Sequence, residues 1–342
     1  MGRTKVYGVR KLAEKAGVST ATVSRVLNNH PGVSEDARSR ILDLMKQTRT
    51  PTRALDRPAH VLVVVGSSIE SYLTEIMAGI ARYTHEHRMT AEFAFNPKTR
   101  MDLDFVRFVR ERRCDGVLDL CMGSRPEELA ELAKVGMPIM VIGEKIDLPG
   151  SGYLMIDSYA GAGDVVAHLA SLGHREIFFL ANGNDESRDL FLRRRGYEHG
   201  MAEAGLAVHE RRIIAHIPNP DTQKSGYFQT QRLLEQSPEV TAIVASTDEM
   251  AYGAMQACRE KGLSIPGEVS VVGFDDYRHS AFWTPGLTTL RQPLEEFGHV
   301  AMHQLDMVIN GLTEELPRCV RQGELIIRGS TASPTLAKGR SS

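Results

Sequence analysis

The stretch Gly17-Val18-Ser19-Thr20-Ala21-Thr22-Val23-Ser24-Arg25-Val26-Leu27-Asn28 predicts a turn and a short helix near the N-terminus of this 342-residue chain. Gly17 can adopt the left-handed backbone that a sharp turn needs. Val23, Val26 and Leu27 recur at the spacing of one buried helix face. The other face carries small, polar and basic side chains, which suit base-pair edges and phosphates: Thr20, Ala21, Ser24, Arg25 and Asn28. With another helix expected over residues 9–16, the pattern predicts a helix-turn-helix.

Charge is divided unevenly along the chain. Residues 1–57 hold twelve Lys and Arg against five Asp and Glu, a net charge of +7, whereas the remainder carries −9. A small basic module on a large acidic body is typical of a protein that contacts nucleic acid at one end. A third helix is expected after Ser34, whose hydroxyl can cap it, and it should end before Pro51.

Composition excludes several classes of protein. No apolar run approaches the roughly 20 residues of a membrane span, and no secretory signal pattern is found. The four cysteines (114, 121, 258 and 319) form no metal-binding or redox motif and are expected to be reduced thiols. We therefore expect a cytoplasmic protein without a membrane segment, a bound metal or a cofactor.

From His60 onward, predicted strands and helices alternate. Strands are expected over 60–65, 90–95, 116–120 and 139–142, and a second series begins near Tyr153 with 153–156, 176–181, 212–215, 242–245 and 269–274. A last helix over 293–310 and a strand over 324–327 should complete the fold. Repeated strand–helix units predict parallel sheets with helices on both faces. The fold class is therefore α/β, with an all-α headpiece preceding two lobes of doubly wound parallel sheet.

These patterns set the expected domain boundaries. The headpiece should cover residues 1–50, and a proline-containing linker or hinge should cover 51–59. The two-lobed domain should occupy 60–342. Its N-lobe is expected over about 60–158 and 291–320, and its C-lobe over about 159–290 and 321–335.

Polar side chains follow the predicted strands of the second lobe, where ligands bind in open parallel sheets. Asp275 follows the strand at 269–274, Asp248 follows the strand at 242–245, and Arg193 lies on the helix after the strand at 176–181. Carboxylate and guanidinium groups suit a polyhydroxyl ligand, because each sugar hydroxyl both donates and accepts a hydrogen bond. Asp248 fits a helix N-cap equally well, and Asp276 fits a turn better than a ligand contact.

Catalytic signatures are not found. The sequence contains no G-x-x-x-x-G-K-[ST], no H-E-x-x-H and no G-x-S-x-G pattern. We therefore expect the protein not to be an enzyme. A sugar-modifying enzyme fused to a DNA-binding segment would need a base, a nucleophile or a metal set, and none is evident.

Taken together and in order, several motifs resemble the lac-repressor (LacI/GalR) family of transcription regulators. The similarity runs over about residues 5–335. It is carried by the stretches 12–19, 22–28 and 32–34, by Leu172-Gly173-His174-Arg175, by Val272-Gly273-Phe274-Asp275-Asp276, and by the run from Thr284 to Pro293.

The resemblance implies the binding partners and the residues that contact them. The family forms a homodimer, or a dimer of dimers, on a near-palindromic double-stranded operator. By position, Thr20, Ala21 and Arg25 read bases, while Thr22, Ser24 and Asn28 hold the DNA backbone. An effector binds between the lobes; the matching positions are Tyr72 and Leu73 in the N-lobe, and Asp189, Arg193, Asp221, Asp248 and Asp275 in the C-lobe.

The linker departs from the family pattern. A leucine that wedges into the minor groove is typical, but Pro58 stands at the matching position. Leu55 can serve as a displaced wedge, although Pro58 would shorten any helix there. We expect operator bending weaker than the family norm.

The sequence thus predicts a DNA-binding transcriptional regulator, expected to be a repressor, controlled by a small-molecule effector. A sugar or sugar derivative is the favoured effector and a purine the second choice. The alternative function is a solute-binding receptor of the transport type, which would need an export signal and no basic headpiece. The sequence shows the reverse of both.

Overall fold

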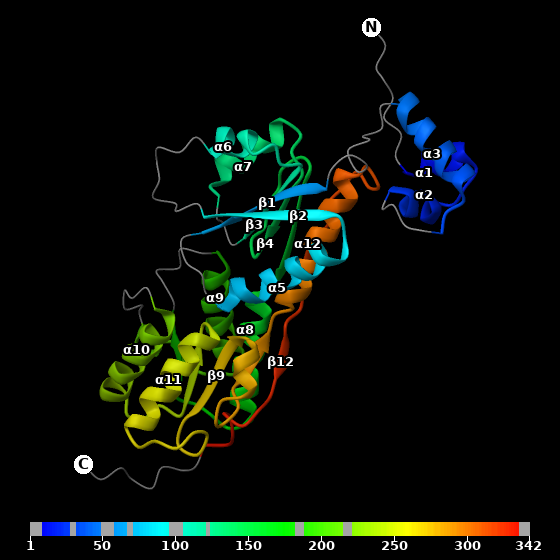
Figure 1. The fold of residues 1–342 in the computed structure, drawn as a ribbon. Helices are drawn as coiled ribbons and strands as arrows, with labels where there is room; N and C mark the ends of the chain where they lie inside the picture. The colour runs from blue at the N-terminus through cyan, green and yellow to red at the C-terminus, as the bar shows by residue number, and fades with distance from the viewer. Residues whose placement is uncertain are drawn as a thin grey trace. The chain divides into compact units, whose positions relative to one another are not determined.

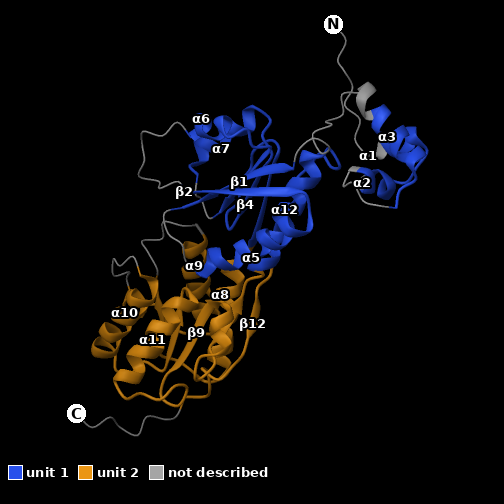
Figure 2. Cartoon of the chain, in the orientation of Figure 1, with its two compact units in different colours: residues 1–155, 294–319 blue, residues 156–293, 320–342 orange. Residues whose placement is uncertain are grey.

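The computed structural model describes residues 9–27, 32–48, 58–66, 71–95, 105–120, 124–181, 188–214 and 221–334 (Figure 1). The chain divides into two compact units (Figure 2). Unit 1 comprises Met1–Met155 and Leu294–Cys319, and unit 2 comprises Ile156–Pro293 and Val320–Ser342. Each unit is therefore built from segments that are far apart in the sequence.

The described part of the headpiece in unit 1 contains three helices, α1 (Val9–Ala16), α2 (Thr20–Leu27) and α3 (Glu35–Thr48). Gly17 has a φ of 66°, as the turn prediction required. The hydroxyl of Ser34 accepts a hydrogen bond from the backbone N–H of Ala37 at 3.3 Å, so the predicted cap of α3 is confirmed. Side chains from all three helices form one small core: Leu12, Ala13, Ala16, Val23, Val26 and Ile41.

The sheet of unit 1 has the strand order β11-β5-β4-β3-β1-β2. Its strands are β1 (Ala59–Val65), β2 (Met89–Phe95), β3 (Gly116–Leu120), β4 (Ile139–Ile142), β5 (Ser151–Ile156) and β11 (Arg318–Arg321). Successive neighbours from β2 to β5 pair in parallel, as predicted. The expectation that β5 opens the second series was wrong, because β5 pairs with β4 and completes the first sheet.

Helices α5 (Ser71–Glu86), α6 (Phe105–Glu111), α7 (Pro126–Lys134) and α12 (Leu294–Ile309) belong to unit 1. Helix α12 packs against α5, although more than half of the chain separates them (Figure 1). Gly79 and Gly298 permit this close approach, because a Cβ at either position would overlap the backbone of the facing helix.

The sheet of unit 2 has the strand order β12-β10-β9-β8-β6-β7. Its strands are β6 (Ile177–Leu180), β7 (Ile213–Ile214), β8 (Ala242–Ala245), β9 (Ser270–Asp275), β10 (Thr288–Arg291) and β12 (Glu324–Ile326). All neighbours pair in parallel except β12, which is antiparallel to β10. Strands β10 and β11, which are short and flanked by turn residues, were not predicted from the sequence.

The longer helices of unit 2 are α8 (Ser158–Ser171), α9 (Arg188–Glu203), α10 (Thr222–Gln236) and α11 (Asp248–Glu260). The 3₁₀ turn η1 (Glu210–Arg212) lies between α9 and β7, and η2 (Arg278–Ala281) lies between β9 and β10. Helices α8 and α9 pack as one pair, and α10 and α11 as the other. Within the described segments, every helix is too short or too polar to cross a bilayer.

Candidate functional site

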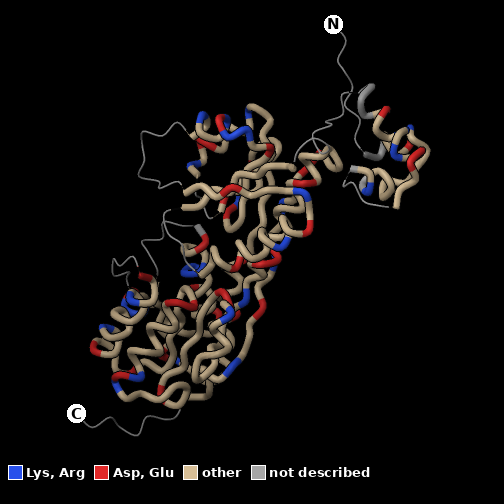
Figure 3. Tube along the Cα trace, in the orientation of Figure 1, with Lys and Arg blue, Asp and Glu red and all other residues tan. Residues whose placement is uncertain are grey.

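Helix α2 separates a buried face from an exposed one. Val23 and Val26 are completely buried against the headpiece core, whereas Thr20, Ala21 and Arg25 are exposed. An α-helix with small side chains and an arginine on its free face can enter the major groove of DNA. Figure 3 shows how basic and acidic residues are distributed along the described trace.

The other predicted DNA-binding residues are either partly buried or outside the described residues. Thr22 is half-buried, and its hydroxyl shares a 2.8 Å hydrogen bond with that of Ser19. This contact orients the start of α2, which suits the predicted backbone-holding role. The side chain of Ser24 and all of Asn28 and Leu55 lie outside the described residues.

Arg193 is the centre of a second polar site, at the carboxyl edge of the unit 2 sheet. The residue is only 3% exposed. One guanidinium nitrogen donates to the carbonyl oxygen of Ser246 at 2.6 Å and lies 3.3 Å from the carboxylate of Asp275. The other terminal nitrogen donates to Asp189 at 2.5 Å. The guanidinium also lies over the ring of Phe274, with its carbon 3.8 Å from the ring centre.

The electrostatics of this cluster favour a charged arginine. Burial opposes the charge on Arg193, but the carboxylates of Asp189 and Asp275 outweigh it and raise the pKa of the guanidinium above its usual value. Burial raises the pKa of Asp275 to about 7, and the neighbouring guanidinium of Arg193 opposes that rise. The carboxylate of Asp275 therefore takes up a proton more readily than that of an exposed aspartate.

Asp275 ends β9 with an unusual backbone. Its φ is 128°, and that of Asp276 is 57°. The side-chain amide of Gln292 donates to the Asp275 carboxylate at 2.5 Å. Sequence patterns did not single out Gln292. Its place directly after β10 could have identified it, but that strand was not predicted.

Asp248 lies behind this edge rather than on it. It is completely buried at the first residue of α11, and Thr247 is the N-cap. The Asp248 carboxylate accepts hydrogen bonds from the backbone N–H of Tyr277 and the hydroxyls of Ser280 and Thr289. Burial raises the pKa of Asp248 to about 6. Three protein donors thus occupy the carboxylate, so its evident role is to support the loop after β9.

Asp189 and Asp221 come from the N-terminal ends of two helices. Asp189 accepts from Arg193 and from the hydroxyl of Ser158, so it belongs to the Arg193 cluster. Asp221 is the N-cap of α10, accepts from the backbone N–H of Lys224 at 3.0 Å, and pairs with the ammonium of the same lysine at 3.2 Å. That backbone hydrogen bond lowers the pKa of Asp221.

Tyr72 and Leu73, the predicted N-lobe contacts, begin α5 of unit 1. Leu73 is 6% exposed, whereas Tyr72 is half-buried. Of the seven predicted effector residues, the structure thus brings Asp189, Arg193 and Asp275 into one cluster, with Asp248 behind them.

The cluster has capacity for further hydrogen bonds. The Nε atom of Arg193 is buried and has no hydrogen-bond partner among the described residues. A buried donor without an acceptor is costly, so a ligand oxygen that satisfies it is favoured. Guanidinium and carboxylate groups with fixed positions can bind a hydroxylated ring, since they present donors and acceptors side by side.

Family models match two parts of the chain. Residues 10–49 match the model described as bacterial regulatory proteins, lacI family, and residues 166–331 match a periplasmic binding protein-like domain. The HTH-type transcriptional repressor PurR of Salmonella newport is 30% identical over 316 residues. That alignment covers 88% of this chain and 90% of the relative.

Solved structures show the same architecture. A transcriptional regulator CelR–cellobiose complex superposes with a TM-score of 0.69 at 26% identity, covering 95% of this chain and 99% of that one. The lac repressor dimer bound to operator has the same fold, with a TM-score of 0.69 at 24% identity, covering 96% of this chain and 100% of that one. The chain belongs to the lacI family of bacterial regulatory proteins.

Proposed function

We propose that the protein is a transcriptional repressor that binds a specific double-stranded operator through α2 and responds to a sugar-like effector at the Arg193 cluster. The proposal includes no catalytic step, and it places the protein in the cytoplasm because bacterial operators are there. The transport-receptor alternative gives no role to the headpiece that matches the lacI family model at residues 10–49.

The observation that carries the proposal is the environment of Arg193. A buried guanidinium, with one donor that lacks a described partner, is aligned by Asp189, Ser246 and Asp275. Such a preorganised donor–acceptor set costs little entropy when a polyhydroxyl ligand binds. Cellobiose bound to the similar CelR supports a sugar over a purine. The effector contacts predicted for Tyr72, Leu73, Asp221 and Asp248 also stay predictions.

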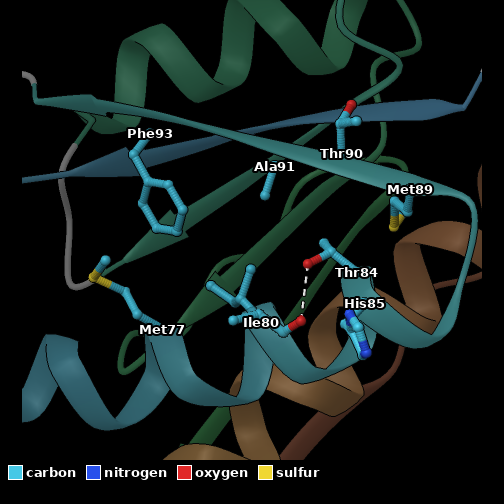
Figure 4. A pocket seen from close by; sticks show the side chains of 9 residues that line it. Met77, Ile80, Thr84, His85, Met89, Thr90, Ala91 and Phe93 are labelled. Atoms are coloured by element: carbon cyan, nitrogen blue, oxygen red, sulfur yellow. Dashed lines mark hydrogen bonds between the residues drawn. The ribbon is translucent and has the colours of Figure 1, made fainter.

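We further propose that the active form is a homodimer, because two-fold symmetry lets two headpieces bind two half-sites. Unit 1 offers a surface for this contact. A groove of about 470 Å³ lies between α5 and β2, lined by Met77, Ile80, Met89 and Phe93 among others (Figure 4). Strand β2 is the edge of its sheet, and a second copy packed beside it would bury the apolar side chains of this mixed groove.

Selection of duplexes from randomised DNA, followed by fluorescence anisotropy, tests the DNA-binding part. We expect Arg25→Ala to lose about 1–3 kcal/mol of discrimination for each half-site contact while non-specific binding changes little. Arg40→Ala is the matched control, because Arg40 is an exposed arginine of the same headpiece that lies on α3, outside the recognition helix. Equal loss in both variants, or no sequence preference in the wild type, would contradict the proposed readout.

The effector part is tested with the same operator and a sugar panel. Titration with cellobiose, D-ribose, D-glucose and D-glucose 6-phosphate should identify a compound that changes operator affinity. Arg193→Lys should retain operator binding and lose the response. A response that survives this substitution would place the effector elsewhere.

A further inference from the structure

The chain leaves β9 through two consecutive residues with positive φ, Asp275 at 128° and Asp276 at 57°. Neither is glycine, and L-residues adopt such backbones at a cost in free energy. In the described residues, Arg113 is the one other non-glycine residue with positive φ. Two in succession, at the end of the strand that supplies a site residue, need strong support from neighbouring groups.

That support comes from the side chain of Asp276. One of its oxygens accepts from Arg291 at 2.7 Å and the other accepts from Arg328 at 2.6 Å. The Asp276 side chain is 6% exposed and that of Arg328 is 19% exposed, whereas that of Arg291 is 46% exposed, so the pair with Arg328 is the better shielded of the two. Arg291 ends β10 and Arg328 follows β12, so a single carboxylate links the turn to two neighbouring segments.

The partners of Asp276 are themselves fixed. Arg328 donates to the carbonyl oxygen of Leu287 at 2.7 Å, and its backbone N–H donates to the hydroxyl of Thr288 at 2.9 Å. The backbone N–H of Asp276 lies 3.3 Å from the hydroxyl of Thr289, which in turn donates to Asp248. The turn is thus held at its side chain and at its backbone.

We propose that Asp276 is a positioning residue for the effector site: its ion pairs with Arg291 and Arg328 offset the free-energy cost of the left-handed turn that directs Asp275 toward Arg193. In this assignment Asp276 acts through Asp275 rather than by direct contact with the effector, since each of its oxygens already accepts from a guanidinium group. The inference rests on the proposed function of the Arg193 cluster. It makes the affinity of that cluster for the effector depend on the contacts of Asp276 with Arg291 and Arg328.

Three substitutions in the full chain separate backbone geometry from ion pairing. Asp276→Ala removes both ion pairs and leaves a Cβ in the left-handed region, so we expect effector affinity to fall by at least about tenfold, equivalent to about 1.4 kcal/mol. Asp276→Gly also removes the ion pairs but adopts positive φ without strain, so affinity should recover to within about threefold of the wild type. Asp276→Asn tolerates the left-handed region better than Ala and should lie between them.

The measurement is the dissociation constant for whichever of cellobiose, D-ribose, D-glucose or D-glucose 6-phosphate the wild type binds, obtained by calorimetry below the unfolding temperature of every variant. Arg211→Ala is the matched control, since it breaks an exposed ion pair of the same unit, Arg211–Glu239 at 3.6 Å, and should leave affinity unchanged. If Asp276 only stabilised the fold, its substitutions would lower the unfolding temperature, but the effector affinity lost in Asp276→Ala would not return in Asp276→Gly.

The outcomes distinguish this inference from the proposed function. A wild-type chain that binds a sugar through Arg193, with Asp276→Ala binding equally well or with Asp276→Gly as weak as Asp276→Ala, overturns the positioning role alone. A wild-type chain that binds none of the four sugars overturns the proposed sugar response and this inference with it.

Discussion

Replacing Arg193 with lysine keeps the positive charge but removes the planar fork that holds the cluster together. The guanidinium contacts Asp189, Ser246 and Asp275 at 2.5, 2.6 and 3.3 Å. A lysine ammonium is a point charge on a different stem and cannot hold all three acceptors in this geometry. It also lacks the flat face that lies over the ring of Phe274.

The magnitude follows from the hydrogen bonds that a lysine cannot make. A hydrogen bond to a charged group is worth about 1.5–3 kcal/mol, so removing two of them should destabilise unit 2 by about 3 kcal/mol or more. For a unit of this size each kcal/mol corresponds to a shift of about 2–4 °C, so the unfolding temperature should fall by about 6–12 °C.

The assay is specific for unit 2. Trp283 is the only tryptophan of the chain, and its ring stacks on Tyr252 with ring centres 4.8 Å apart. Thermal unfolding followed by tryptophan fluorescence therefore reports on unit 2 rather than on the headpiece. Arg195→Lys is the control, because Arg195 is an exposed neighbour on the same helix. If the two variants unfolded within about 1 °C of each other, the hydrogen bonds of the Arg193 guanidinium would not stabilise unit 2 by the amount given above.

Three further predictions follow from the geometry. Gly17→Ala should destabilise the headpiece by about 1 kcal/mol, because φ is 66° there; circular dichroism of the headpiece transition measures it, and an unchanged midpoint would contradict the turn argument. Effector binding should weaken about tenfold between pH 8 and pH 6, because burial raises the pKa of Asp275 to about 7 and protonation removes its negative charge. Calorimetry measures this, and the affinity of Asp275→Asn should not change with pH. A wild type whose affinity is independent of pH would refute the prediction. Phe93→Glu in the α5–β2 groove should shift the protein toward monomer in sedimentation, whereas Val135→Glu, at an exposed apolar position of the same unit that does not line the groove, should have a smaller effect; equal effects would contradict the proposed dimer surface.

Local patterns predicted the headpiece well, because its helices are specified by neighbouring residues. The turn at Gly17 and the cap at Ser34 depend on side chains within a few residues, and both are confirmed. The parallel strand–helix units were equally readable from their apolar runs and turns.

Long-range features were harder to predict. The assignment of β5 to the first sheet depends on its pairing with β4, which hydropathy does not encode. Strands β10 and β11 are four residues each, which is too short for a residue pattern to distinguish them from loop segments.

The candidate site shows the same limit. The sequence identified Asp275 because it directly follows a predicted strand, and Arg193 because it lies on the helix after another strand. The role of Asp248 as a buried support was not distinguishable from a ligand contact, since its donors Tyr277, Ser280 and Thr289 come from segments 29 to 41 residues away.

The central claim is that one chain couples a DNA-reading helix to a small-molecule receptor. Linkage makes this claim measurable: the factor by which the effector changes operator affinity must equal the factor by which saturating operator changes effector affinity. In the wild type we expect both affinities to change by the same factor, of about 5–150. In Arg193→Lys we expect neither affinity to change. An effector that binds with the same affinity with and without operator DNA would contradict the claim.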